Sequence, residues 1–203
     1  SLVVISTGTL LAALAASGVE AMAAALYYLV HSTLVAAGFF LLAAQIAAAR
    51  GETGDSFVTG PALARAATVG AAYMVFALAI CGVPPLSGFL GKLMIMRSIQ
   101  TAPLGAAAWV ALLVASLLPA LVLARAASVF FWEPKPAPAI AEKTRLGLPA
   151  LATLMLLAAS PLLVAFAAPV ADYARAAAEQ LHSPETYGAV LGADPAISRE
   201  RRP

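Results

Sequence analysis

The sequence predicts an all-α fold, a polytopic transmembrane helical bundle in which prolines break one helix. Hydrophobic residues make up 62% of the 203 residues and charged residues only 11%, whereas soluble domains carry about 25% charged residues. The mean hydropathy is +0.91, and several apolar runs reach the roughly 20 residues that cross a bilayer. One of these runs contains GVPPLSGFLGKL, whose adjacent prolines cannot continue a regular helix. The chain is therefore predicted to lie in a lipid bilayer, and nothing indicates a nucleic-acid partner.

Polar residues bound the first two predicted spans. Residues 2–16 are apolar and uncharged, and Gly18 and Glu20 mark the turn that follows them. Residues 21–49 form the second span, which ends at Arg50 and the polar stretch RGETGDS. Both runs are typical of membrane helices, the first being the shorter.

The third predicted span carries the break. It starts near Pro61, passes through AAYMVFALAICGV, and continues beyond the two prolines to about Ile99. Residues 104–132 and residues 146–178 form the fourth and fifth spans, because the proline-rich and charged stretch EPKPAPAIAEKTR separates two long apolar runs.

We therefore expect one transmembrane domain of about five spans, residues 1–178, and a polar C-terminal tail, residues 179–203. The first residues, SLVVISTGTL, have no initiating methionine, no basic region and no small-residue cleavage site, so they do not form a signal peptide. The chain is expected to begin partway through a helix and to be the C-terminal part of a longer subunit.

Basic residues gather on one predicted side of the membrane, the side on which the chain starts. That side holds Arg50, Arg65, Lys135, Lys143 and Arg145, whereas the opposite side holds Arg97 and Arg175 close to a span. Because cytoplasmic loops carry an excess of lysine and arginine, the C-terminus is predicted to lie outside.

Lys92 lies inside an apolar run, where a charge is costly. A lysine at the centre of a membrane helix costs about 2.5 to 3.5 kcal/mol, so it marks a functional site by default. Apolar surroundings disfavour the ammonium, which can then exchange a proton if water or a polar neighbour reaches it. The alternative is a lysine that extends toward the membrane surface, since Lys92 stands about seven residues before the end of the span.

The break supplies polar surroundings for Lys92. Pro84 and Pro85 have no N–H to donate, and Gly82, Ser87 and Gly88 are the other small or flexible residues of the break. The carbonyls that the break frees are tolerated where they face protein or a water-filled cavity. Broken helices are also where many transporters bind their coupling ions.

His31 is the second titratable group in an apolar span. Histidine titrates near neutral pH and is suited to a proton relay. Ser32 and Thr33 stand beside it, and Tyr27, four residues earlier, falls on the same helical face, so these three are candidate polar supports. The alternative is a histidine that only packs against a neighbouring helix.

The sequence predicts no metal site and no cofactor. Cys81 is the only cysteine, and the two histidines, His31 and His182, are far apart. Arg125 precedes the aromatic run VFFW and is interpreted as an interfacial residue that extends toward it.

These residues resemble a known family. AALYYLVHSTLVAAGFFLLA, RGETGD and AAYMVFALAICGVPPLSGFLGKLMI are similar to segments of the proton-conducting membrane transporter family, which includes the antiporter-like subunits of respiratory complex I and of Mrp-type cation/proton antiporters. The stretch YYLVHSTL favours the D-type subunits of the Mrp-type antiporters.

The resemblance implies long transmembrane helices in two inverted repeats, each with a broken helix. This chain would supply the broken helix of the second repeat and the C-terminal spans. Lys92 occupies the position of the family's lysine after PP-x-SGF-x-G, and His31 that of the histidine in the preceding span. Complex I relatives often carry a lysine four residues after that histidine, where this chain has Val35. The glutamate and lysine of the family's first repeat are not in this sequence.

The resemblance also implies a function. It is that of a membrane subunit of a multisubunit Na⁺ or other monovalent cation/H⁺ antiporter in the bacterial inner membrane, with other subunits as partners and protons passing through Lys92 and His31. The alternative is a proton-pumping subunit of complex I or of a membrane-bound hydrogenase. A third interpretation is a structural remnant that conducts nothing.

Overall fold

The computed structural model describes residues 2–54, 56, 58–61, 63, 65–100, 105–132 and 147–183. This part of the chain contains helices and no strand, which confirms the predicted all-α class. By length and composition, three of its helices can cross a membrane: Val19–Ala49, Gly105–Trp132 and Leu148–Ala165. The shorter apolar helices Leu2–Ala15 and Ala66–Cys81 accompany them. The expected EPKPAPAIAEKTR loop and residues 184–203 of the expected tail lie outside the described residues.

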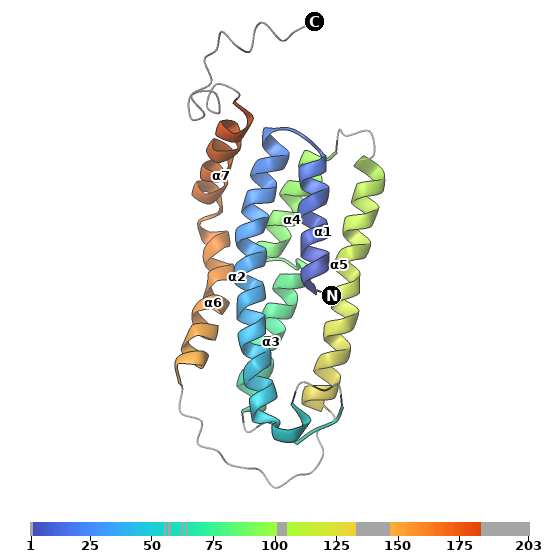
Figure 1. The fold of residues 1–203 in the computed structure, drawn as a ribbon, viewed down its shortest axis with the longest axis vertical. Helices are drawn as coiled ribbons and strands as arrows, with labels where there is room; N and C mark the ends of the chain where they lie inside the picture. Colours follow the sequence, from blue (N-terminus) through green and yellow to red (C-terminus); the bar gives the residue numbers. More distant parts are fainter. Residues whose placement is uncertain are drawn as a thin grey trace, which may run out of the picture.

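Helix α2 (Val19–Ala49) is the central element of the bundle. Its 31 residues correspond to about 46 Å at 1.5 Å per residue, more than the hydrocarbon thickness of about 30 Å. It packs against α1 (Leu2–Ala15), against the broken helix and against the two last helices, and Figure 1 shows it running the full height of the bundle. Side chains on α2 therefore face α1, both parts of the broken helix and the two last helices.

The broken helix consists of α3 (Ala66–Cys81) and α4 (Ser87–Ser98). Gly82 ends α3 with a left-handed backbone (φ 78°), a conformation that suits glycine at a helix C-terminus. The N–H groups of Gly82 and Val83 both bond to the carbonyl of Leu78 at 3.0 Å. The peptide bond between Pro84 and Pro85 is cis. Along the ribbon, α4 continues upward from α3 (Figure 1).

Helix α5 (Gly105–Ala127) returns down the bundle and ends in the π-helical segment η2 (Ser128–Trp132). The fifth predicted span is two helices, α6 (Leu148–Ala165) and α7 (Ala167–His182), rather than one. They meet at Phe166, whose backbone is not helical (φ −104°, ψ 27°). Pro169 explains the interruption, because it has no N–H for the carbonyl four residues earlier and its ring crowds that carbonyl.

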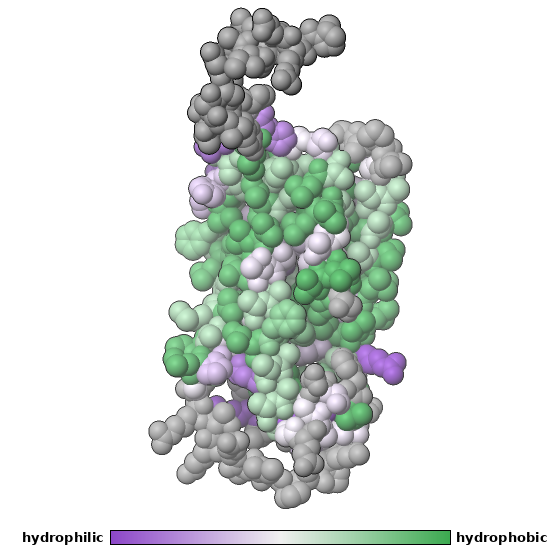
Figure 2. Space-filling view, in the orientation of Figure 1, coloured by the Kyte–Doolittle hydropathy of each residue, from purple (hydrophilic) through white to green (hydrophobic). Residues whose placement is uncertain are grey.

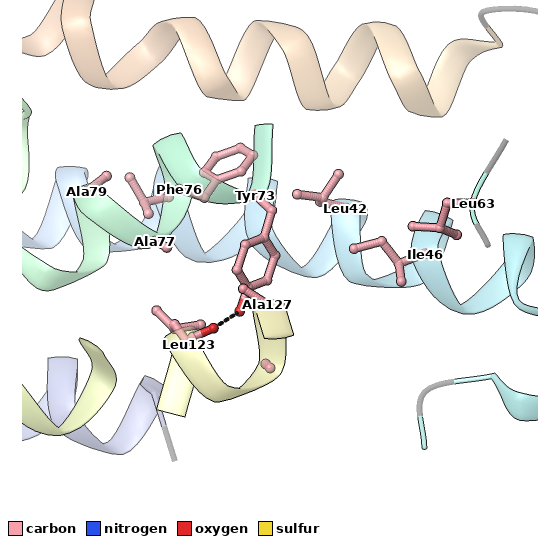
Figure 3. Packing of buried hydrophobic residues seen from close by; sticks show 11 residues of the cluster. Leu42, Ile46, Leu63, Tyr73, Phe76, Ala77, Ala79, Leu123 and Ala127 are labelled. Carbon is pink, nitrogen blue, oxygen red and sulfur yellow. Dashed lines mark hydrogen bonds between the residues drawn. The ribbon is translucent and has the colours of Figure 1, made fainter. Parts of the chain in front are cut away.

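The largest hydrophobic cluster joins α2, α3 and α5. Figure 3 shows its aromatic and aliphatic side chains, with the Tyr73 hydroxyl donating to the carbonyl of Leu123 at 2.8 Å. Phe76 lies over Gly38, where a methyl group would come within 2.4 Å of the ring. Gly38 is therefore required for this close approach of α2 and α3.

The outer surface is apolar over the middle of the bundle. Figure 2 shows hydrophobic residues covering the centre of the face and hydrophilic residues gathered toward its ends. On α5 the exposed large hydrophobic residues are Val110, Leu113, Val114, Leu117, Leu118, Leu121 and Val122. Such a surface suits contact with lipid or with other apolar helices.

Arg50 closes one end of α2. Its guanidinium donates to the carbonyls of Gly54 (2.8 Å), Ser56 (2.9 Å) and Val58, and it lies over the ring of Phe130 at 4.8 Å from the ring centre. Three backbone carbonyls thus bind the charged group at the end of the bundle, and α2 ends at Ala49, where the sequence predicted the end of the second span. At the opposite end, Glu20 and Arg175 form an ion pair between α2 and α7.

Candidate functional site

Lys92 lies on α4 and its side chain turns back toward the end of α3. The residue is buried, with 8% of its surface exposed. Its ammonium donates to the carbonyls of Ile80 (3.1 Å) and Cys81 (3.0 Å) and to the hydroxyl of Ser116 on α5 (3.0 Å). An ammonium has three N–H donors, so each donor has one acceptor. Two of the three acceptors are carbonyls of the last turn of α3, which ends at the break.

The C-terminal end of α3 also suits a positive charge. The last carbonyls of a helix have no partner within it and carry the negative end of the helix dipole. Lys92 supplies both hydrogen bonds and charge at this position. The structure therefore brings Lys92 to the bundle interior, not to its surface.

His31 lies on α2, and its side chain is next to the start of α4. Its Nδ1 is 2.7 Å from the hydroxyl of Ser87, and that hydroxyl is 2.8 Å from the hydroxyl of Ser160 on α6. Ser160 also accepts a bond from the Ser87 N–H at 3.3 Å, which satisfies a free N–H of the first turn of α4. All three side chains are at most 2% exposed. They form a continuous, buried line of hydrogen bonds from α2 through α4 to α6.

Glycines allow the two titratable groups to approach one short stretch of backbone. A methyl group on Gly88 would lie 2.9 Å from His31 Nε2 and 2.0 Å from the carbonyl of Ala79. A methyl group on Gly82 would lie 3.2 Å from Lys92 Nζ and 3.4 Å from the carbonyl of Gly88. His31 and Lys92 therefore reach the same helix break from different directions.

The remaining predicted residues take several positions. Pro84 and Pro85 form the break, while Ser87 and Gly88 are the first residues of α4.

Of the candidate supports of His31, none is bonded to it. Tyr27 donates to the carbonyl of Leu163 on α6 at 3.0 Å, Ser32 bonds the carbonyl of Leu29 within its own turn, and Thr33 is exposed. The aromatic neighbour of the imidazole is Tyr28, with ring centres 5.6 Å apart.

Two further residues of the site, Ser116 and Ser160, were not found from the sequence. Each is a single hydroxyl in an apolar helix, a composition that is common in membrane helices. Their contacts with Lys92 and Ser87 span 24 and 73 residues of chain. No local pattern predicts such pairs. The sequence feature that could have identified the two serines was a polar side chain within an apolar span.

A cavity of about 630 Å³ opens beside His31. It lies between α1, α2, α3 and α5, and most of its lining is apolar. Its side chains with a hydroxyl group are those of Ser6, Thr7, Ser32, Thr33 and Tyr73. Within the described residues, no cluster of three histidine, cysteine or acidic groups could hold a metal ion. The site thus consists of two titratable groups, hydroxyls and backbone carbonyls.

The residues of this site lie mostly within a stretch that matches a family model. The model of the NADH:quinone oxidoreductase/Mrp antiporter transmembrane family matches residues 4–121. The chain belongs to this family. The match includes most of α1, all of α2 to α4 and most of α5, and therefore His31, the break, Lys92 and Ser116. Ser160 lies beyond the matched residues.

Individual members of the transmembrane family are similar to the chain over part of its length. The D subunit of the Na⁺/H⁺ antiporter of Bacillus subtilis (strain 168) is 31% identical over 44% of this chain. The D subunit of a probable K⁺/H⁺ antiporter of Rhizobium meliloti (strain 1021) is 32% identical over 59%. The N 3 subunit of the NADH-quinone oxidoreductase of Streptomyces griseus is 29% identical over 63%. The matched regions span 18%, 27% and 23% of these relatives.

Proposed function

We propose that the chain is part of a membrane subunit of a multisubunit monovalent cation/H⁺ antiporter and that protons pass through Lys92 and His31. The observation that carries the proposal is the buried ammonium of Lys92, bonded to three oxygens at a helix break. Burial of a lysine in the membrane costs free energy. A role as a proton carrier would explain why a lysine occupies this position.

The line of hydrogen bonds at His31 supports a proton path. Imidazole can take up a proton on one ring nitrogen and release one from the other. The hydroxyls of Ser87 and Ser160 can each donate and accept, so they pass a proton along the line without becoming charged. Lys92 stores a proton at the other side of the same break.

Two of the three relatives are named as antiporter subunits, one for Na⁺ and one for K⁺. They support a monovalent cation as the exchanged ion and other subunits as partners. We assign the subunit to the bacterial inner membrane. The end of the bundle with Arg50 and Arg65 faces the cytoplasm by the positive-inside rule, which puts the end of α7 and the C-terminus outside.

The similarity to an NADH-quinone oxidoreductase subunit supports a second candidate function. In a redox-driven pump, electron transfer in other subunits would move protons through the same lysine and histidine. The two candidates differ in their driving force. An antiporter moves protons in response to a cation gradient, whereas the pump requires electron transfer.

The first experiment measures proton movement in everted vesicles that contain the full chain in its native complex. Pulses of NaCl or KCl are added after an acid-inside gradient is imposed, without any respiratory substrate, and a pH-sensitive dye reports the interior. We expect Na⁺ or K⁺ to release protons, with choline chloride as the control. Proton movement that occurs only with a respiratory substrate would contradict the antiporter and favour the pump.

Replacing Ser160 with alanine is expected to slow this proton movement about fivefold. The substitution removes two hydrogen bonds to Ser87, one with its N–H and one with its hydroxyl. The bond between the hydroxyls lies on the path and is worth about 1 kcal/mol, and without it the line of hydroxyls ends at Ser87. Ser98→Ala is the matched control, because the Ser98 hydroxyl bonds the carbonyl of Ile95 within its own helix. Equal rates in Ser160→Ala and in the parent protein would remove Ser160 from the path.

A further inference from the structure

Ser116 differs from the other two groups that are bonded to Lys92. Its hydroxyl accepts from the ammonium at 3.0 Å and donates to the carbonyl of Leu112, one turn earlier on α5, at 2.8 Å. Ile80 and Cys81 contribute carbonyls, which accept and never donate. Of the three acceptors bonded to Lys92, Ser116 is the one that carries a hydrogen.

The difference matters because an ammonium and an amine need different partners. The ammonium has three N–H donors, and the site offers three acceptors. After the loss of a proton, the amine has two N–H donors and one lone pair. The carbonyls of Ile80 and Cys81 can keep the two donors. The lone pair then needs a donor in place of the third acceptor.

The Ser116 hydroxyl can supply that donor by rotation alone. Rotation about the Cβ–Oγ bond turns the hydrogen from the Leu112 carbonyl to Nζ, without movement of the helix. The Leu112 carbonyl is not left without a partner, because the regular helix also gives it the N–H four residues later. The nearby N–H groups of Gly82 and Val83 are already bonded to Leu78.

We infer that Ser116 is a positioning residue that reverses its hydrogen bond when Lys92 loses its proton. The amine and the ammonium are thereby held at the same place, and Nζ makes all of its own hydrogen bonds in both states. In one step, Nζ gives a proton to a water molecule at the break, which becomes hydronium. The N–H bond electrons stay on nitrogen as its lone pair, and the serine hydrogen turns toward that lone pair. The inference rests on the proposed function only in that Lys92 changes its protonation state during transport.

The titratable groups around Lys92 are contributed by other elements. They are Cys81 on α3 and His31 on α2. Ser116 adds a hydroxyl from α5 and no charge. Its removal therefore changes hydrogen bonding at Nζ and leaves the titratable groups around it in place.

The test compares Ser116→Ala with Ser116→Thr in the full chain, assembled in its native complex. Threonine keeps a hydroxyl on the same carbon. We expect cation-driven proton movement to fall about tenfold in Ser116→Ala, because this substitution removes one hydrogen bond to a charged group. In Ser116→Thr, proton movement should recover to at least half of the parent rate. Ser128→Ala is the control, since the Ser128 hydroxyl also bonds back to its own helix.

A second readout does not depend on transport. Acetic anhydride acetylates the free lone pair of a neutral amine, and mass spectrometry gives the rate at Lys92 relative to Lys135 in the purified complex at high pH. We expect this rate to rise several-fold in Ser116→Ala, where no hydroxyl bonds to the lone pair, and to stay low in Ser116→Thr. An unchanged relative rate in Ser116→Ala, or an equal rise in Ser116→Thr, would overturn the inference. Absent proton movement in the parent protein would instead count against the proposed function alone.

Discussion

Lys92→Met is expected to reduce cation-driven proton movement about a hundredfold or more while the complex still assembles. Methionine matches the length and apolar stem of lysine but carries no exchangeable proton, and removal of a proton-transfer group costs about 10²- to 10⁴-fold. The everted-vesicle assay measures the loss, and a native gel measures assembly.

Two opposing free-energy terms explain why assembly should survive. The substitution leaves two carbonyls and one hydroxyl without their donor, at about 1 to 3 kcal/mol for each group that stays unsatisfied. It also removes a buried charge that costs about 2.5 to 3.5 kcal/mol in the membrane. Ser116 keeps its bond to Leu112, so the two terms are of similar size.

Arg97→Met is the matched control for Lys92→Met. Arg97 is a basic residue on the same helix, α4, but it is exposed. Its replacement should leave proton movement unchanged. Proton movement at the parent rate in Lys92→Met would make Lys92 a packing residue and would contradict the proposed path.

Gly88→Ala is expected to lower the thermal stability of the complex and to abolish proton movement. The added methyl group would lie 2.0 Å from the carbonyl of Ala79 and 2.9 Å from His31 Nε2, so α4 would have to move away from α3 and α2. Overpacking of this kind costs about 1 to 3 kcal/mol. The same movement would separate Ser87 from His31.

Gly70→Ala distinguishes this steric effect from a general effect of replacing glycine. A methyl group on Gly70 would lie 3.6 Å from the ring of Phe131, an ordinary contact, and alanine favours a helix over glycine by about 1 kcal/mol. Its thermal stability should equal or exceed that of the parent. If Gly88→Ala were as stable and active as Gly70→Ala, the result would contradict the close packing of α4 against α3 and α2 at the break.

The sequence predicted the parts of the fold that depend on composition and on local chemistry. Long apolar runs predicted the helical bundle, because a lipid solvent leaves few alternatives for the backbone. The break was predicted because proline lacks an N–H and glycine permits a left-handed end. Lys92 and His31 were recognised because a titratable group is rare in such a run.

The partners of these groups could not be predicted, because they come from other helices. Ser116 and Ser160 resemble any serine in an apolar helix until packing brings them to Lys92 and Ser87. Tyr27 was expected to support His31 because of its helical spacing, but its hydroxyl donates to the carbonyl of Leu163 on α6. The interruption at Phe166 was missed because α6 and α7 are joined without a loop.

The length of α2 has a consequence for the membrane voltage. His31 stands 11 residues from Glu20 and 19 residues from Arg50, about 16 and 28 Å along the helix. With these two charged residues at the ends of the bundle, a proton that binds His31 from the Glu20 end crosses about one third of the transmembrane electric field. Moving one charge across the whole field is worth about 2.3 kcal/mol per 100 mV, so this partial step is worth about 0.8 kcal/mol. If protons pass through His31 as we propose, membrane potential acts on the protonation of His31 as well as on net transport.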